Sequence, residues 1–215
     1  NSCPPAERWL RQAMPGKYGP RQIVPLAFHV DYWDDLGWKD RFAQSRFSAR
    51  QHLHARRNRA QTIYTPQFLL NGKDVRVADS VLSQRLALIN AQTSGAQIHL
   101  RQTGAVDHIG IDVTLSLLSG GKSAQTEAFV ALSEIDLYSE VRAGENAGKR
   151  LAHEFVVREL LGPIALEPAS SVSWSATIPI APDWKRENLA LTVFIQDTGN
   201  NDILQALRAP ACDGS

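Results

Sequence analysis

"HIGIDVTLSLLSGG", residues 108–121, shows most clearly what kind of fold this chain adopts. Ile109, Ile111, Val113 and Leu115 alternate with small or polar residues, and the run ends at a pair of glycines. A period of two indicates a β-strand that turns one face to the core and the other to solvent. This stretch therefore predicts a strand of an antiparallel sheet.

The same alternation recurs on both sides of this strand. It appears in "IHLRQTG", "TEAFVALSEID", "HEFVVRELLG", "SVSWSATIPI" and "LALTVFIQDTGN", with turn-like residues between them. Many short alternating strands are typical of a β-sandwich or barrel. Toward the N-terminus the pattern changes near "QTSGA", residues 92–96, where helical periods and continuous apolar runs replace it. We therefore predict an α/β domain over 1–93 and an antiparallel β-sandwich domain over 94–215.

Length and composition suit this division. The chain has 215 residues, of which 43% are hydrophobic and 21% charged, as in a folded protein of one large or two ordinary domains. The net charge of +1 gives no reason to expect a nucleic acid partner. Residues 41–59 hold six arginines and two histidines without an acid, which we interpret as a solvated helix face rather than an anion-binding surface. We expect no membrane span, since no apolar run approaches the roughly 20 residues that one needs.

The first domain has a recognisable order of elements. The predicted elements are a helix from Cys3, a strand over 22–30 that is buried on both faces, a basic helix over 43–57, a strand–Pro66–strand segment over 62–75 with an Asn71-Gly72 turn, and a helix over 77–92. Pro25 is unusual within a central strand. The order is that of a thioredoxin-like fold without its opening strand.

Two residues of this order point to thiol chemistry. Cys3 stands at the start of the first helix, where free amide groups and the helix dipole stabilise a thiolate. A proline in cis, as we expect for Pro66, lets the adjacent main chain lie against the thiol or an extended substrate. We therefore expect Cys3 to be a redox thiol, and Pro66 with Thr65 to present backbone to a substrate. A structural role for Cys3, or a disulfide with Cys212, stays open.

Several motifs resemble a known family. "SCPPAERWL", "LAFHVDYWDDLGWKDRF", "SARQ", "YTPQFLLNG" and "RAGENAGKRLAHEFVVREL" together are similar to a family of exported bacterial proteins, catalogued as a domain of unknown function. The resemblance covers nearly the whole chain. It implies a thioredoxin-like first domain, a β-rich second domain and a periplasmic or secreted protein whose signal peptide is not in this chain. It also implies a Cys-x-x-Cys motif of which Cys3 is the second cysteine, so we expect an upstream strand and an attacking cysteine outside these residues.

The loop after the 22–30 strand carries the other candidate site residues. If that strand is central, its carboxyl end faces the side where open α/β sheets place their sites. His29 and Asp31 would then lie near Cys3 and Pro66, where they could handle protons during thiol–disulfide exchange. The predicted substrate-binding residues are Tyr32, Trp33, Tyr64 and Gln67.

Each of these residues also has an ordinary structural interpretation. A histidine at a strand end is more often hydrogen-bonded in the core than catalytic. Asp31, Asp34, Asp35 and Asp40 are better suited to loop hydrogen bonds than to a cation, because their spacing fits no EF-hand. His52 and His54 stand two apart on a helix and make a poor metal pair.

Three functions follow from these residues. The leading one is thiol–disulfide exchange with a protein or small thiol, in which the upstream cysteine attacks and Cys3 resolves the mixed disulfide. The competing one is a non-catalytic binding module that captures a ligand or protein between its domains. Metal handling through Cys3, His29 and the aspartates is a weaker third function.

Other expectations concern cofactors and partners. We expect no cofactor, no metal site and no nucleic acid partner, and we expect the protein to be a monomer. Residues 142–150 are predicted to form a polar hairpin, or else to reach across and cover the first-domain site. Separately, Arg158 is a candidate to pair with one of the loop aspartates.

Overall fold

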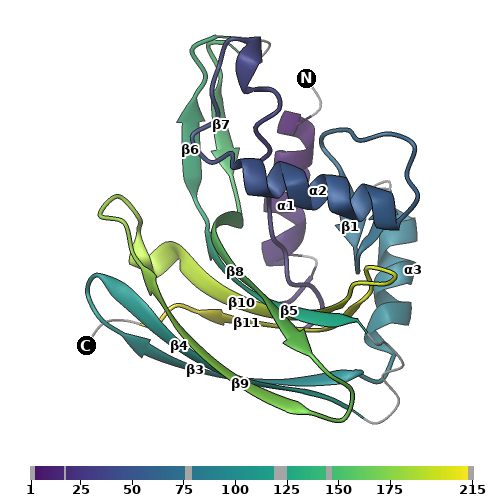
Figure 1. Ribbon diagram of the computed structural model, residues 1–215. Coiled ribbons are helices and arrows are strands. Elements are labelled where there is room, and N and C mark those ends of the chain that lie inside the picture. Colours follow the sequence, from purple (N-terminus) through teal and green to yellow (C-terminus); the bar gives the residue numbers. More distant parts are fainter. Residues whose placement is uncertain (1–2, 17, 76–78, 119–124, 144–146, 213–215) are drawn as a thin grey trace.

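The protein is a mixed α/β fold with several antiparallel sheets (Figure 1). The computed structural model describes residues 3–16, 18–75, 79–118, 125–143 and 147–212. The elements of the first part are α1 (Cys3–Gly16), a 3-10 turn at Asp34–Leu36, α2 (Ser45–Arg57), β1 (Phe68–Leu70), β2 (Lys73–Val75) and α3 (Asp79–Asn90). Those of the second part are β3 (Ala96–Gly104), β4 (His108–Leu117), β5 (Thr126–Glu134), β6 (Leu137–Glu140), β7 (Arg150–His153), β8 (Val156–Leu166), β9 (Ser171–Pro179), a 3-10 turn at Arg186–Asn188, β10 (Leu189–Asp197) and β11 (Ile203–Pro210).

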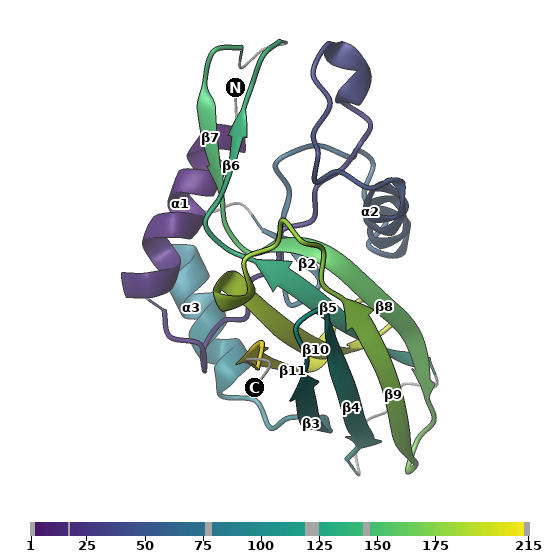
Figure 2. The same cartoon turned by 90° about the vertical axis from the view of Figure 1, so that its left-hand side faces the viewer.

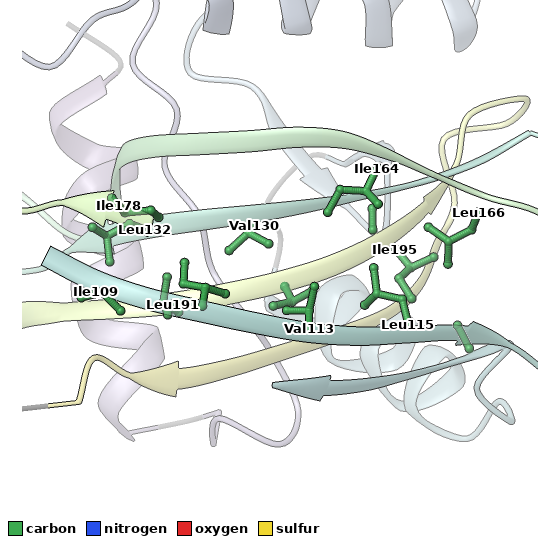
Figure 3. Close-up of a cluster of buried hydrophobic side chains, with 14 of the residues drawn as sticks. Ile109, Val113, Leu115, Val130, Leu132, Ile164, Leu166, Ile178, Leu191 and Ile195 are labelled. Atoms are coloured by element: carbon green, nitrogen blue, oxygen red, sulfur yellow. The ribbon is translucent and has the colours of Figure 1, made fainter. Parts of the chain in front are cut away.

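Two antiparallel sheets enclose the largest core. One has the order β11-β10-β5-β8 and the other β3-β4-β9. The alternating residues Ile109, Ile111, Val113 and Leu115 of β4 all point between the sheets, as Figure 3 shows for three of them, and their exposure is 2% or less. Burying each such side chain contributes about 1.5–3 kcal/mol. The period-two pattern of the sequence thus correctly predicted the inner face of β4.

The four-stranded sheet is covered on both faces. Inward-pointing Val130 and Leu132 of β5 belong to the core between the sheets, whereas Ala131 on the other face packs against Phe47 of α2. Arg50 of α2 lies over the Phe129 ring with its guanidinium carbon 4.4 Å from the ring centroid. This double coverage explains why β5 and β10 are buried at nearly every position rather than at every second one.

The helical layer of the first part contains the predicted hairpin. Phe68–Leu70 pairs antiparallel with Lys73–Val75, and Asn71 and Gly72 in the turn have φ of 50° and 82°. These are the left-handed conformations that a two-residue hairpin turn needs, and Asn-Gly favours them. The strand expected before Pro66 is not found, because residues 61–67 run without ladder hydrogen bonds.

The expected strand over 22–30 is wrong. That segment is extended and half-buried, and its single ladder contact is a parallel bridge between Ala27 and Val156. The amide of Ala27 donates to Phe155 O at 2.8 Å, and the amide of Val157 donates to Ala27 O at 2.9 Å. The segment is therefore attached to the first residues of β8, at the edge of the four-stranded sheet, and is no central strand. Proline at position 25 removes one of the amides that a longer ladder would use.

The β6–β7 hairpin extends away from the sheets and lies beside α1, as both views show (Figures 1 and 2). It confirms the hairpin expected around residues 142–150, although residues 144–146 lie outside the described part of the chain. The boundary predicted near residue 93 falls between α3 and β3 and stays a prediction. Among the described residues no helix is both long and apolar enough to span a membrane.

Candidate functional site

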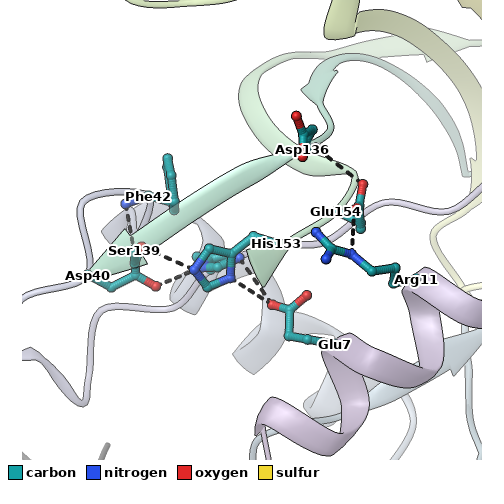
Figure 4. A network of polar contacts seen from close by, with 9 residues as sticks. Glu7, Arg11, Asp40, Phe42, Asp136, Ser139, His153 and Glu154 are labelled. Carbon is teal, nitrogen blue, oxygen red and sulfur yellow. Dashed lines mark hydrogen bonds and ion pairs between the residues drawn. The ribbon is translucent and has the colours of Figure 1, made fainter. Parts of the chain in front are cut away.

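A group of acids and histidines lies where α1, the extended segment 24–30 and the β6–β7 hairpin meet. It consists of Glu7, His29, Asp40, Ser139 and His153, and we call it the acid–histidine cluster (Figure 4). Each of these elements contributes at least one member, so the cluster joins parts of the chain that are far apart in sequence. The cluster is therefore a polar site that only the folded chain assembles.

His29 is held between two carboxylates. Its Nδ1 lies 2.6 Å from Asp40 Oδ2, and its Nε2 lies 3.9 Å from Glu7 Oε1. Burial alone would lower the pKa of His29, but the hydrogen bond to Asp40 and the charges of Asp40 and Glu7 outweigh it, so the pKa is raised. Burial would likewise raise the pKa of Asp40, yet the hydrogen bond and charge of His29 lower it. Both shifts favour the charged imidazolium–carboxylate form of the pair.

His153 closes the cluster from the hairpin. Its Nδ1 lies 3.0 Å from Glu7 Oε1, and its Nε2 lies 3.1 Å from Ser139 Oγ across the hairpin. A carboxylate only accepts, so Nδ1 is the donor in this contact, whereas the serine hydroxyl can either donate to Nε2 or accept from it. Glu7 Oε1 thus faces both imidazoles. The other oxygen, Glu7 Oε2, is buried and has no hydrogen-bond partner among the described residues.

Aromatic contacts fix the two imidazole rings. The His29 and His153 centroids are 5.1 Å apart at an interplanar angle of 77°. The ring of Phe42 contacts both in the same edge-to-face manner, at 5.6 Å from His29 and 5.5 Å from His153. Phe42 also packs with Leu137 and Val156 in a small apolar cluster. The two imidazole rings therefore pack against an apolar side chain, which restricts their rotation.

An ion pair anchors α1 to the hairpin beside the cluster. Arg11 Nε donates to Glu154 Oε1 at 2.9 Å, and Glu154 Oε2 accepts from the Asp136 amide (Figure 4). Arg11 stands four residues after Glu7, hence on the same side of α1. The ion pair sets the position of the helix and so the approach of Glu7 to the histidines.

A second group of candidate residues lies around Pro66. The Thr65–Pro66 peptide bond is cis, as expected. Trp33 Nε1 donates to Thr65 Oγ1 at 2.9 Å, so the aromatic loop and the proline segment are joined directly. Trp9 of α1 meets Phe68 edge-to-face at 5.5 Å, which places the helix against the same segment. The structure thus brings the expected loop and proline residues together.

Gln51 of α2 is the centre of a hydrogen-bond network behind this segment. Its Oε1 accepts from the Tyr32 hydroxyl at 3.0 Å, and its Nε2 donates to Tyr64 O and to Gln67 Oε1, each at 3.0 Å. Tyr64 and Gln67 in turn both donate to Asp74. All four predicted substrate-binding residues therefore belong to one surface, and sequence reasoning missed Gln51 and Asp74.

The loop aspartates are used for local structure. Asp31 pairs with Ser48 rather than with His29, which separates the two predicted proton-handling residues. Asp34 accepts from the Asp40 amide at 3.1 Å, as the loop interpretation expects. Arg158 was expected to pair with an aspartate of the 31–40 loop, but its ion pairs are with Glu134 and, at 4.0 Å, with Asp183. Its Nη1 lies 3.3 Å from Glu134 Oε2, because both side chains come from adjacent strands of one sheet.

The remaining predicted residues have separate positions. Cys3 is the first residue of α1, one helical turn before Glu7. Cys212 is a half-buried free thiol. On α2, His52 is exposed whereas His54 is buried, so the two do not form a metal pair. Sequence reasoning missed Glu7, Ser139 and His153, although the spacing from Cys3 to Glu7 was a usable signal for the first of them.

Comparison with known proteins shows the fold and the family. A crystal structure from Agrobacterium tumefaciens matches with a TM-score of 0.66 and 24% identity, over 96% of this chain and 87% of that one. HBP35 of Porphyromonas gingivalis matches with a TM-score of 0.59 and 12% identity, over 77% of this chain and 58% of that one. At these identities the likeness shows the fold alone. None of the curated proteins matches. The family model described as a protein of unknown function (DUF1223) matches residues 1–196, so this chain belongs to the DUF1223 family.

Proposed function

We propose that this protein carries out thiol–disulfide exchange through Cys3, on a protein or small-thiol partner in the periplasm or outside the cell. In this proposal the helical layer is a thioredoxin-like domain and the two large sheets are a separate β-sandwich domain. The observation that carries it is the place of Cys3 as the first residue of the 14-residue helix α1. A thiolate at that position interacts with the free amides and the positive end of the helix.

A docking surface beside Pro66 supports the proposal. Trp33 and Tyr64 are 51% and 40% exposed, so two large aromatic rings lie partly open to solvent at this surface. Trp33 is nevertheless held by Thr65, and Tyr64 by Asp74. Exposed rings that are fixed in place suit contact with an extended polypeptide, because little side-chain entropy remains to be lost on binding.

The proposed step conserves atoms and electrons. The thiolate of Cys3 attacks one sulfur of a disulfide, a new bond forms between Cys3 Sγ and that sulfur, and the other sulfur leaves as a thiolate. When the disulfide joins this protein to its partner, the same step releases the partner in its reduced form. No cofactor takes part, since the disulfide itself is the oxidant.

Exchange with oxidised glutathione tests the proposal. Within residues 1–215 the Cys212→Ser variant keeps Cys3 as its one thiol, and Cys3→Ser keeps Cys212 as the matched control. Intact mass spectrometry after short incubations measures the glutathione adduct. We expect Cys212→Ser to react faster when folded than when unfolded in denaturant at the same pH, because unfolding removes the helix. We expect Cys3→Ser to react more slowly than Cys212→Ser.

The opposite ordering refutes this function. If folded Cys212→Ser reacts no faster than the unfolded chain, α1 does not activate Cys3. A non-catalytic binding module then remains, for which the exposed Trp33 and Tyr64 are the candidate contact residues.

A further inference from the structure

We propose that Glu7, His29 and His153 form a binding site for one divalent ion of the zinc type, with the fourth coordination position open to water or a small ligand. The site lies in the acid–histidine cluster and does not use Cys3. It therefore goes beyond the proposed thiol chemistry and stands or falls separately from it.

The three donor atoms are already close to the required spacing. One oxygen of Glu7 and one ring nitrogen each of His29 and His153 lie within 4.8 Å of one another. Zinc bonds of about 2.0–2.1 Å in a tetrahedron put two donors roughly 3.4 Å apart. Glu7 Oε1 lies 3.0 Å from His153 Nδ1 and 3.9 Å from His29 Nε2. These two contacts are each within about half an ångström of that spacing. The ring nitrogens of His29 and His153 lie at most 4.8 Å apart, so side-chain rotation has to bring them closer by no more than about 1.4 Å.

The donor types determine which class of metal ion the site would bind. Two imidazoles and one carboxylate form the set that open zinc sites use, with three protein ligands and a free position. Calcium and magnesium prefer a shell made of oxygen atoms, which the two ring nitrogens would not provide. A borderline transition metal is therefore the expected occupant.

Both histidines have the outer hydrogen bonds that metal ligands need. Asp40 Oδ2 holds His29 Nδ1 at 2.6 Å, which turns Nε2 toward Glu7. Ser139 Oγ lies 3.1 Å from His153 Nε2. Because a hydroxyl can accept as well as donate, it can accept a hydrogen bond from Nε2–H in the tautomer whose Nδ1 is free for a metal. Such outer partners orient the ligand rings and strengthen the bond to the ion.

Charge and burial fit a dication. Glu7 and Asp40 bring two negative charges to the cluster, and the nearby Arg11 is committed to Glu154. The Oε2 of Glu7, which is buried and has no hydrogen-bond partner among the described residues, offers a further lone pair on the same carboxylate. The side chains of His153, His29 and Glu7 are 5%, 11% and 20% exposed, so the donors are shielded while Glu7 leaves an approach from solvent.

Metal titration of the full chain tests the site. The protein is first treated with a chelator and dialysed, then titrated with Zn²⁺ by calorimetry and with Co²⁺ by visible absorption, which reports tetrahedral nitrogen–oxygen coordination. We expect one ion per chain. Glu7→Gln and His153→Gln should each weaken binding by about 100-fold or more, and Asp40→Asn by about 10- to 100-fold. His52→Gln, which removes an exposed histidine, should leave binding unchanged.

Each variant is checked by far-UV circular dichroism, and Asp40→Asn, which keeps size and shape, serves if a ligand variant does not fold. Absence of Zn²⁺ and Co²⁺ binding by the wild-type chain overturns the site, as does binding that Glu7→Gln and His153→Gln leave intact. Cys3→Ser separates the site from the thiol function. Unchanged metal affinity together with lost exchange supports both proposals, whereas lost metal binding makes the thiol a ligand and overturns this set of three residues.

Discussion

His54 of α2 gives the sharpest prediction about stability. Its side chain is buried, and its Nδ1 has no hydrogen-bond partner among the described residues. Burial lowers the pKa of His54 to about 4, and the positive charges of Arg50 and Arg57 on the same helix add to this effect. The folded protein therefore holds His54 neutral over a range in which the unfolded chain protonates it.

The sign and size follow from proton linkage. Because the folded pKa lies below the unfolded value of 6.5, stability is lost as the pH falls from about 6.5 toward 4. The full difference corresponds to roughly 3.4 kcal/mol at 1.36 kcal/mol per pKa unit. Between pH 7.5 and pH 5 the part contributed by His54 is about 2 kcal/mol.

Denaturant unfolding of the wild type and of His54→Leu at these two pH values isolates this contribution. Leucine keeps an apolar side chain of similar size but does not titrate. Other groups contribute to the pH dependence of both proteins, so the relevant quantity is the difference between them. We expect the wild type to lose about 2 kcal/mol more than His54→Leu between pH 7.5 and pH 5.

His52→Leu is the matched control, because it removes an exposed histidine from the same helix. It should follow the wild-type pH dependence. If His54→Leu also follows the wild type to within about 0.5 kcal/mol, folding does not suppress the protonation of His54 and the reasoning fails.

Two further predictions concern stability. Gly72→Ala should cost more than about 3 kcal/mol, because φ is +82° and a Cβ would stand 1.7 Å from Asn201 O, whereas Gly148→Ala at φ +78° meets nothing within 4 Å and should cost about 1–2 kcal/mol. Equal midpoints in denaturant would contradict this. Arg158→Met should cost about 3–5 kcal/mol, because it leaves the buried Glu134 carboxylate without its cation. Adding Glu134→Gln should recover part of that loss, and a double variant no more stable than Arg158→Met would refute the pairing.

The antiparallel strands could be predicted because their signal is local. In any sheet that buries one side, alternating apolar residues such as Ile109 and Val113 show which face of the strand is buried. The Asn71-Gly72 turn was equally predictable, because its two positions have positive φ and Asn-Gly favours that conformation.

The segment 22–30 shows what a local sequence pattern does not predict. Its apolar residues correctly indicated that it is buried. A segment at the edge of a sheet and a strand within the sheet can have the same apolar composition, so the pattern does not distinguish them. The deciding contact is the pairing of Ala27 with Val156, and nothing near Ala27 in the sequence encodes that partner. Likewise His29 was identified as a site residue, but its partner Asp40 was not distinguished from three other aspartates nearby.

The acid–histidine cluster has a consequence for how the protein is made. Glu7 and His153 are 146 residues apart. At a synthesis rate of about 5–20 residues per second, roughly 7–30 s pass between the emergence of the first and the second. During that interval a nascent chain presents Cys3 and Glu7 without the hairpin residue His153 that later contacts Glu7. The thiol at the start of α1 therefore meets its cellular surroundings before the cluster beside it exists, and only completion of the β6–β7 hairpin gives the mature environment.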